Sequence, residues 1–276
     1  MAILLALCAA TVYGAADFYG GLASRRTAAV TVVVLSQLAG MALLGLVWLV
    51  LPGRFYASDV VWGALAGIAG GVGIAALYAG LAVGRMGVVS PLSAVIGASV
   101  PVIAGLATGE RPGGLALTGV ASAFVAVALV SANAESRRIS LREPGVMPAV
   151  LSGLGIGALY VCLAHGHGDA GLARVLIARC ASLLLLIAYA FLRRERLRPA
   201  RGALPMISLA GALDMSANVL YVLATGHGLL AIVAVLTSLY PAATVFLALV
   251  VLHERLSRSQ WAGVALAVCG VVLIAV

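Results

Sequence analysis

Four charged side chains interrupt long apolar stretches of the chain, at Asp17, Arg174, Arg179 and Asp214. Charges at membrane depth are rare, and they mark substrate pathways, proton relays or ion pairs. Arg179 and Asp214 fall near the middle of two successive stretches, so we predict that they lie at similar depth and share a salt bridge or polar network. Such a pair either takes part in binding or only fixes helix packing. Arg174 lies near one end of its stretch, where a long side chain extends to the surface.

Asp17 has no basic residue at matching depth on its own stretch. We predict that it binds a proton or a substrate; the alternative is a buried neutral acid. Tyr13 lies four residues before Asp17, while Asn218 and Tyr221 lie four and seven residues after Asp214. These spacings place side chains on one face of a helix. We therefore expect the Asp17 face and the Asp214 face to line a central cavity.

Further polar and aromatic residues complete the expected lining. Gln37 aligns with Arg179 in an internal sequence repeat. Tyr78, together with Tyr19 and Tyr160, is expected to add an aromatic, hydrogen-bonding surface. A tyrosine is more often an interfacial anchor or core filler than a binding residue, so each of these residues alone is weak evidence.

The sequence offers only weak candidates for a metal site and no catalytic motif. His165, His167 and Asp169 occupy a glycine-rich gap, and His227 in a second gap is expected on the same side. Flexible gaps make a poor ligand cage, so we predict turns and no metal. The chain holds no Gly-x-Ser-x-Gly, no His-Glu-x-x-His and no Gly-x-x-x-x-Gly-Lys, and we expect neither catalysis nor a cofactor.

Membrane-spanning helices must position these residues. The chain of 276 residues is 63% hydrophobic and 9% charged, a composition that no soluble fold can bury. Ten stretches reach the roughly 20 helical residues that span a bilayer. The expected helices are Ile3–Leu22, Ala28–Leu51, Val60–Val83, Val88–Thr108, Leu115–Ala132, Val146–Ala164, Ala170–Leu192, Ala203–Ala224, Leu229–Leu252 and Gln260–Val276. Gly63, Gly67 and Gly71 form a small-residue ridge on the third, which favours close helix packing.

The arginines alternate along the chain, which carries a formal net charge of +8. Thirteen of them lie in the gaps after the odd-numbered helices, whereas only Arg54 and Arg111 lie in the gaps after even-numbered ones. Basic loops stay in the cytoplasm, so this bias predicts that both termini lie outside. The arginines have no interleaved aromatic residues, and a topology signal explains them better than nucleic-acid binding does.

The two halves of the chain repeat a set of motifs. Each of two Glu-Arg pairs ends an apolar stretch and is followed, nine residues after the glutamate, by a glycine. The recurring motifs are Glu110-Arg111 with Gly119 and Glu254-Arg255 with Gly263, Leu77-Tyr78 and Leu220-Tyr221, and Gly14 with Tyr19 and Gly155 with Tyr160. Five helices in each half imply opposite orientations. We predict two inverted five-helix repeats, residues 1–134 and 145–276, joined by residues 135–144.

The Glu-Arg pairs with their glycines, Pro241 in the ninth helix and Tyr13-Gly14 in the first resemble the drug/metabolite transporter superfamily. More specifically, they are similar to its EamA-type proteins of ten helices, and the resemblance covers the whole chain. It implies export of amino acids, metabolites or drugs through a central cavity, without ATP hydrolysis.

These observations predict an all-α membrane protein that acts as a secondary transporter by alternating access. We expect a small-molecule substrate, proton coupling or exchange, and a multi-pass location in the inner (plasma) membrane. We also expect no nucleic-acid partner, and a monomer or homodimer. The alternatives are a membrane channel and an intramembrane enzyme: saturable exchange indicates a carrier, conductance a channel, and product formation an enzyme.

Overall fold

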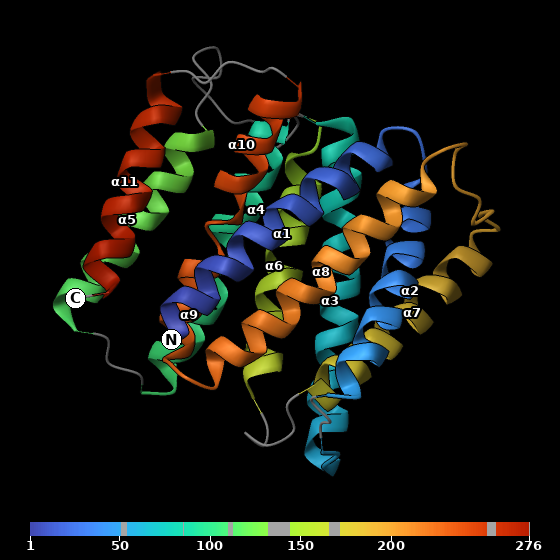
Figure 1. Cartoon of the computed structure of the whole chain (residues 1–276), viewed down its shortest axis with the longest axis horizontal. Coiled ribbons are helices and arrows are strands. Elements are labelled where there is room, and N and C mark those ends of the chain that lie inside the picture. The colour runs from blue at the N-terminus through green and yellow to red at the C-terminus, as the bar shows by residue number, and fades with distance from the viewer. Residues whose placement is uncertain are drawn as a thin grey trace.

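A computed structural model describes residues 1–50, 54–84, 86–109, 113–131, 144–165, 172–252 and 258–275. Within these ranges the regular secondary structure is helical throughout (Figure 1). The helices are α1 (Ala2–Ser24), α2 (Ala29–Trp48), α3 (Ala57–Val83), α4 (Met86–Ala107), α5 (Gly114–Ser131), α6 (Val146–Ala164), α7 (Leu172–Leu192), α8 (Leu204–Thr225), α9 (Leu230–Thr237), α10 (Tyr240–Leu252) and α11 (Arg258–Ala275).

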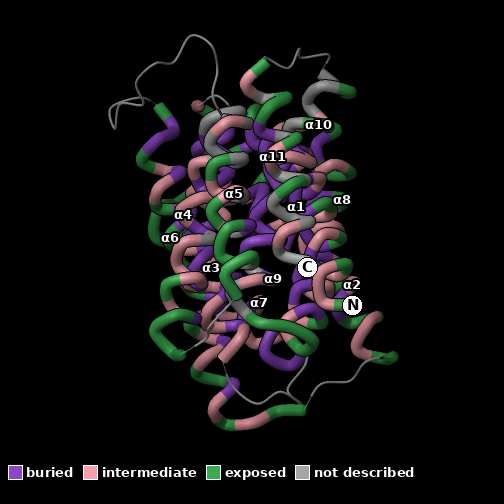
Figure 2. The backbone as a smooth tube through the Cα atoms, turned by 90° about the vertical axis from the view of Figure 1, so that its left-hand side faces the viewer, coloured by how far each residue is buried: buried purple, intermediate pink, exposed green. Residues whose placement is uncertain are grey.

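Six of the described helices, α1, α2, α3, α6, α7 and α8, are long and apolar enough to cross a membrane. Large apolar side chains are also exposed, for example those of Leu184, Phe191 and Phe246. Figure 2 shows that exposed positions, drawn in green, occur along the length of the helices. A water-soluble protein rarely exposes so much apolar surface. The exterior therefore suits lipid, and the chain is a multi-pass membrane protein, as its composition predicts.

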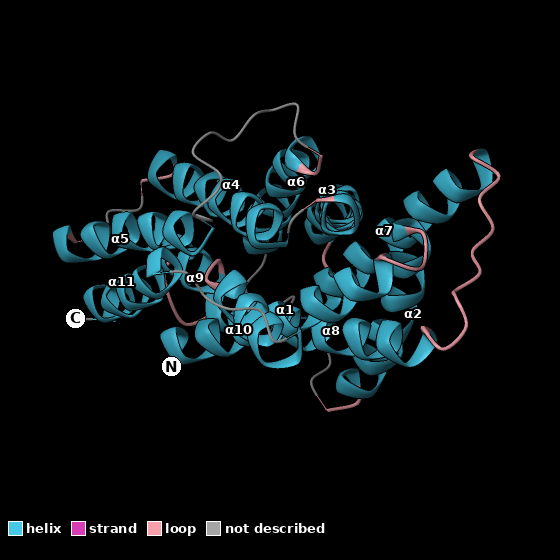
Figure 3. Cartoon of the chain, turned by 90° about the horizontal axis from the view of Figure 1, so that it is seen from above, coloured by secondary structure: helices cyan, strands magenta, loops and turns pink. Residues whose placement is uncertain are grey.

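The helices form two facing rows (Figure 3). In one row α6 packs between α3 and α4, and in the other α1 packs between α8 and α10. Helices α2 and α7 close one end of the bundle, while α5 and α11 pair at the other. This arrangement leaves the facing sides of α1, α3, α6 and α8 to define the centre of the molecule.

The helix expected over Leu229–Leu252 is divided into α9 and α10, which differs from the sequence prediction. Pro241 lies just inside α10 and has no backbone N–H, and its ring clashes with the carbonyl group four residues earlier in a continuous helix. At the break the backbone instead makes hydrogen bonds between residues three apart in sequence. They run from Leu239 N to Leu236 O (3.3 Å) and from Ala242 N to Leu239 O (2.9 Å).

Glycines allow several helices to approach one another at their backbones. The predicted ridge of Gly63, Gly67 and Gly71 is confirmed, since a Cβ atom at each position would collide with α7. On the opposite side of the bundle, a Cβ atom at Gly211 of α8 would overlap the carbonyl group of Ser36 in α2. These contacts hold α7 and α8 at the depth where their charged residues lie.

We expect Gly40→Ala to lower the melting temperature of the detergent-purified protein. A Cβ atom at Gly40 would lie 2.8 Å from the carbonyl oxygen of Gly211 and 3.2 Å from Cβ of Met215, so α2 and α8 must separate. Overpacking of this kind costs about 1–3 kcal/mol. Gly45→Ala in the same helix is the matched control, because its Cβ meets nothing within 4 Å. Equal melting temperatures for the two variants would show that close α2–α8 packing is unimportant.

Candidate substrate site

A central cavity lies between the two rows of helices and contains about 630 Å³ free of protein atoms, counting the part that opens outward. It is lined by seven of the described helices, so residues far apart in sequence meet there. The lining residues are Tyr13, Asp17, Gln37, Ala66, Gly67, Gly70, Gly71, Ile74, Ile156, Leu159, Tyr160, Leu163, Val175, Ala178, Arg179, Ser182, Asp214, Asn218 and Tyr240.

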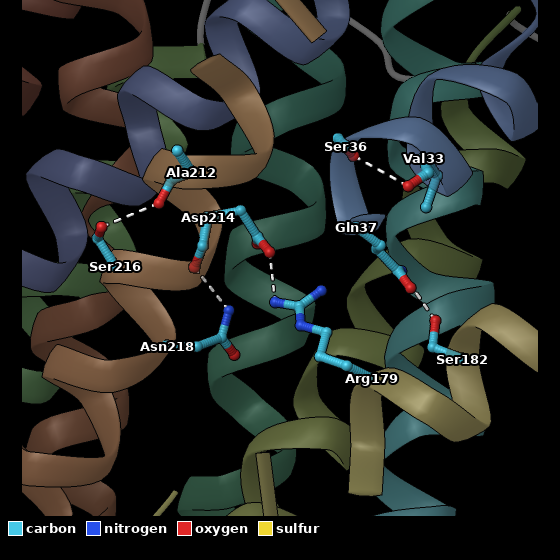
Figure 4. A network of polar contacts seen from close by, with 9 residues as sticks. All are labelled: Val33, Ser36, Gln37, Arg179, Ser182, Ala212, Asp214, Ser216 and Asn218. Carbon is cyan, nitrogen blue, oxygen red and sulfur yellow. Dashed lines mark hydrogen bonds and ion pairs between the residues drawn. The ribbon is translucent and has the colours of Figure 1, made fainter. Parts of the chain in front are cut away.

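The predicted pairing of Arg179 with Asp214 is confirmed. Arg179 of α7 donates a hydrogen bond from its guanidinium group to the carboxylate of Asp214 on α8 (Figure 4). Their side chains are 12% and 19% exposed, because both face the cavity. Asn218, one turn after Asp214, donates from its side-chain amide to the Asp214 carbonyl oxygen (2.7 Å). The pair therefore presents a neutralised polar surface to the cavity.

Asp17 lies on the α1 wall of the same cavity and is 5% exposed. It makes no hydrogen bond or ion pair with any residue that the structure describes. Tyr13, one turn earlier on α1, lines the cavity beside it, as its spacing predicts. Asp17 is thus a carboxyl group that is sheltered from bulk solvent and has no partner in the part of the chain that the structure describes.

Gln37 reaches the cavity from α2 and donates from its side-chain amide to the hydroxyl oxygen of Ser182 on α7 (2.8 Å; Figure 4). Its own oxygen, Oε1, is buried and accepts no hydrogen bond from the described residues. An unmade hydrogen bond in the interior costs about 1–3 kcal/mol. The open acceptor on Gln37 is therefore suited to a donor group brought in by a ligand.

Tyr78 and Tyr221, which we predicted at the lining, lie instead within the helix packing, with 1% and 0% of their surface exposed. The ring of Tyr221 stacks on Tyr160, with centroids 4.5 Å apart. The ring of Tyr78 fills the space that glycine leaves at Gly20 on α1. Both tyrosines support the cavity wall from behind, and Tyr160 contributes to the wall itself.

Arg174 does not extend to the surface, contrary to the sequence prediction. It is buried, and its Nη2 atom lies 3.0 Å from Oδ1 of Asp59. It also donates from Nη1 to the carbonyl oxygen of Leu163, near the C-terminus of α6. The reason is that α3 begins at Ala57, earlier than expected, which brings Asp59 into its first turn. The structure therefore holds a second buried ion pair that the sequence analysis missed.

Two more lining residues escaped the sequence analysis, Ser182 and Tyr240. Ser182 lies one turn after Arg179, so its helical spacing was an available signal. Tyr240 begins α10, and only the break in the helix turns it toward the cavity. Several predicted motifs lie outside the described residues, namely His167, Asp169, Glu110, Arg111, Glu254 and Arg255. Among the described residues, no group of metal-ligand type assembles.

The fold and cavity define a multi-pass helical membrane protein with an internal polar site. The model of the EamA-like transporter family matches residues 143–276. The match agrees with the resemblance to the drug/metabolite transporter superfamily that the sequence motifs indicate, and it supports a membrane transporter of that type.

Comparison with solved structures supports the fold across the entire chain. One protein of known crystal structure is similar, with a TM-score of 0.76 and 17% sequence identity, over 99% of this chain and 95% of that chain. At this level of identity the likeness concerns the fold alone. No curated protein matches the sequence.

Proposed function

We propose that the protein is a secondary transporter that exports a small metabolite, amino acid or drug-like molecule from the cell by alternating access. The observation that carries the proposal is the central cavity between the two rows of helices. It is lined by an ion pair and by a carboxyl group that has no partner among the described residues. Such a site near the middle of a helical bundle is typical of secondary transporters. In this proposal the protein is not an enzyme and resides in the inner (plasma) membrane.

Equivalent helix contacts support the proposed inverted repeats, residues 1–134 and 145–276. Gly14 of α1 packs against the carbonyl oxygen of Tyr240, and Gly157 of α6 packs in the same way against that of Gly97. Both partners in the second contact are 143 residues from their counterparts in the first. In this proposal Gly157, two residues after Gly155, is the counterpart of Gly14. Two such halves can rock against each other around a fixed site.

The energy source in this proposal is a proton gradient acting through Asp17. Transfer from water to an apolar interior disfavours the charged form of a carboxyl group, which allows it to hold a proton there. Asp17 has no cationic partner among the described residues that would keep it ionised. A proton bound on one side of the membrane and released on the other gives coupled export.

The test uses the compound that most raises the melting temperature in a metabolite screen, since a ligand that binds the folded state stabilises it. In proteoliposomes with an imposed pH gradient, we expect Asp17→Asn to abolish accumulation of that compound while part of its equilibration or exchange survives. Glu195→Gln, at an exposed position after α7, removes the same charge outside the cavity and controls for the loss. Unimpaired accumulation by Asp17→Asn would place the coupling group elsewhere.

The arginine distribution predicts the orientation of the chain in the membrane. We expect a C-terminal alkaline phosphatase fusion to be active and a C-terminal fluorescent-protein fusion to be dark, because both termini are predicted outside. Fusions within residues 196–201, in the basic segment after α7, should give the opposite result. A bright C-terminal fluorescent fusion would show that the chain has the opposite orientation.

A further inference from the structure

The charges of the cavity do not balance. Three ionisable acidic or basic side chains line it, Asp17, Arg179 and Asp214. Arg179 and Asp214 neutralise each other, which leaves Asp17 as the lone uncompensated charge among the described lining residues. The guanidinium group of Arg179 is engaged by Asp214, so its positive charge is already compensated.

We propose that the occupant of this cavity is a monovalent organic cation, a protonated amine carried on an apolar body, with Asp17 as its counter-ion. The inference rests on the proposed transport function and names its substrate class. A buried carboxylate is costly without a positive partner. An ammonium group supplies that charge together with N–H donors, whereas an anion would add a second uncompensated negative charge.

Aromatic rings around Asp17 suit the same kind of ligand. Tyr13, Tyr160 and Tyr240 all line the cavity, and the rings of Tyr13 and Tyr160 lie 6.3 Å apart between centroids. The faces of aromatic rings attract cations, an interaction of about 0.5–2 kcal/mol that grows as water is removed. Gln37 offers a further acceptor through its unpartnered Oε1 atom. The polar side of the cavity thus presents acceptors and ring faces to a cation.

The wall formed by α3 and α6 carries no charge and suits the rest of the molecule. On α3 the lining consists of Ala66, Gly67, Gly70 and Gly71, followed by Ile74. On α6 it contributes apolar side chains such as Leu159. An amine with an aromatic or aliphatic body can therefore place its head at Asp17 and its body against α3.

Three probes of matched shape test the assignment on the purified full-length protein by calorimetry at neutral pH. They are 2-phenylethylamine, 2-phenylethanol and 3-phenylpropanoate, which differ in the charge of the head group. We expect the amine to bind at least about tenfold more tightly than the other two, the scale of one hydrogen bond to a charged group. We expect Asp17→Asn to remove that preference and Glu195→Gln to leave it unchanged.

Amine affinity no greater than that of the alcohol, or undetectable at millimolar concentration, would overturn the assignment, as would a preference that survives Asp17→Asn. If Asp17→Asn fails to fold, the order of the three probes on the unmodified protein still decides the question. Flux in proteoliposomes separates this inference from the proposed function. If neutral or anionic compounds are transported without a preference for amines, only the proposed substrate class is rejected. If the amine binds tightly but no probe is transported, the proposed transport function is rejected.

Discussion

Asp59→Asn is expected to destabilise the protein more than any other single neutral substitution at a described charged residue. The change leaves the Arg174 guanidinium buried without its carboxylate, and the two side chains are only 9% and 0% exposed. Breaking a buried pair by removing one partner costs about 3–5 kcal/mol. A loss of that size should lower the melting temperature in detergent by on the order of 10 °C.

The double variant Asp59→Leu with Arg174→Met provides the decisive comparison. It removes both charges and replaces them with apolar groups, which is often neutral for stability. We therefore expect the double variant to melt close to the unmodified protein. Glu195→Gln, at an exposed position, controls for the loss of one acidic group. A single variant as stable as the unmodified protein would mean that Arg174 finds another anion or leaves the interior.

Arg179→Gln is expected to reduce transport by one to two orders of magnitude. The substitution exposes the cavity to two uncompensated carboxyl groups, Asp17 and Asp214, in place of one. A lost hydrogen bond between charged groups is worth about 1.5–3 kcal/mol. The effect on stability should be smaller than that of Asp59→Asn, because Arg179 and Asp214 face the cavity and retain partial exposure.

Initial transport rates of Arg179→Gln, Asp214→Asn and the double variant form a double-mutant cycle. Because the two side chains bond directly, the double variant should lose less activity than the two single losses combined. Variants at the Asp59–Arg174 pair, which lies outside the cavity lining, should combine additively with those at Arg179. Additive losses at Arg179 and Asp214 would show that their contact does not matter for transport.

The positions of Asp17, Arg179 and Asp214 within their helices were predictable, whereas the set of side chains that reaches the cavity was predictable only in part. Asp17 and Tyr13 face the cavity together because residues four apart share a helix face. The same rule placed Tyr221 beside Asn218, yet Tyr221 packs behind the wall against Tyr160. A spacing of seven residues returns to nearly the same face of the helix but two turns further along it, and at that level α8 meets Tyr160 of α6.

The sequence by itself determined that the chain is helical and lies in lipid, since apolar stretches of this length must satisfy every backbone hydrogen bond internally. It also determined that Asp17, Arg179 and Asp214 lie within helices and away from their ends, because that follows from position along an apolar stretch. The tertiary structure decided their partners: Asp59 for Arg174, Asp214 for Arg179 and none for Asp17 among the described residues. These partners depend on where a helix begins, as at Ala57, where it breaks, as at Pro241, and where it touches another helix, as at Gly211. Such contacts join segments that are far apart in the chain.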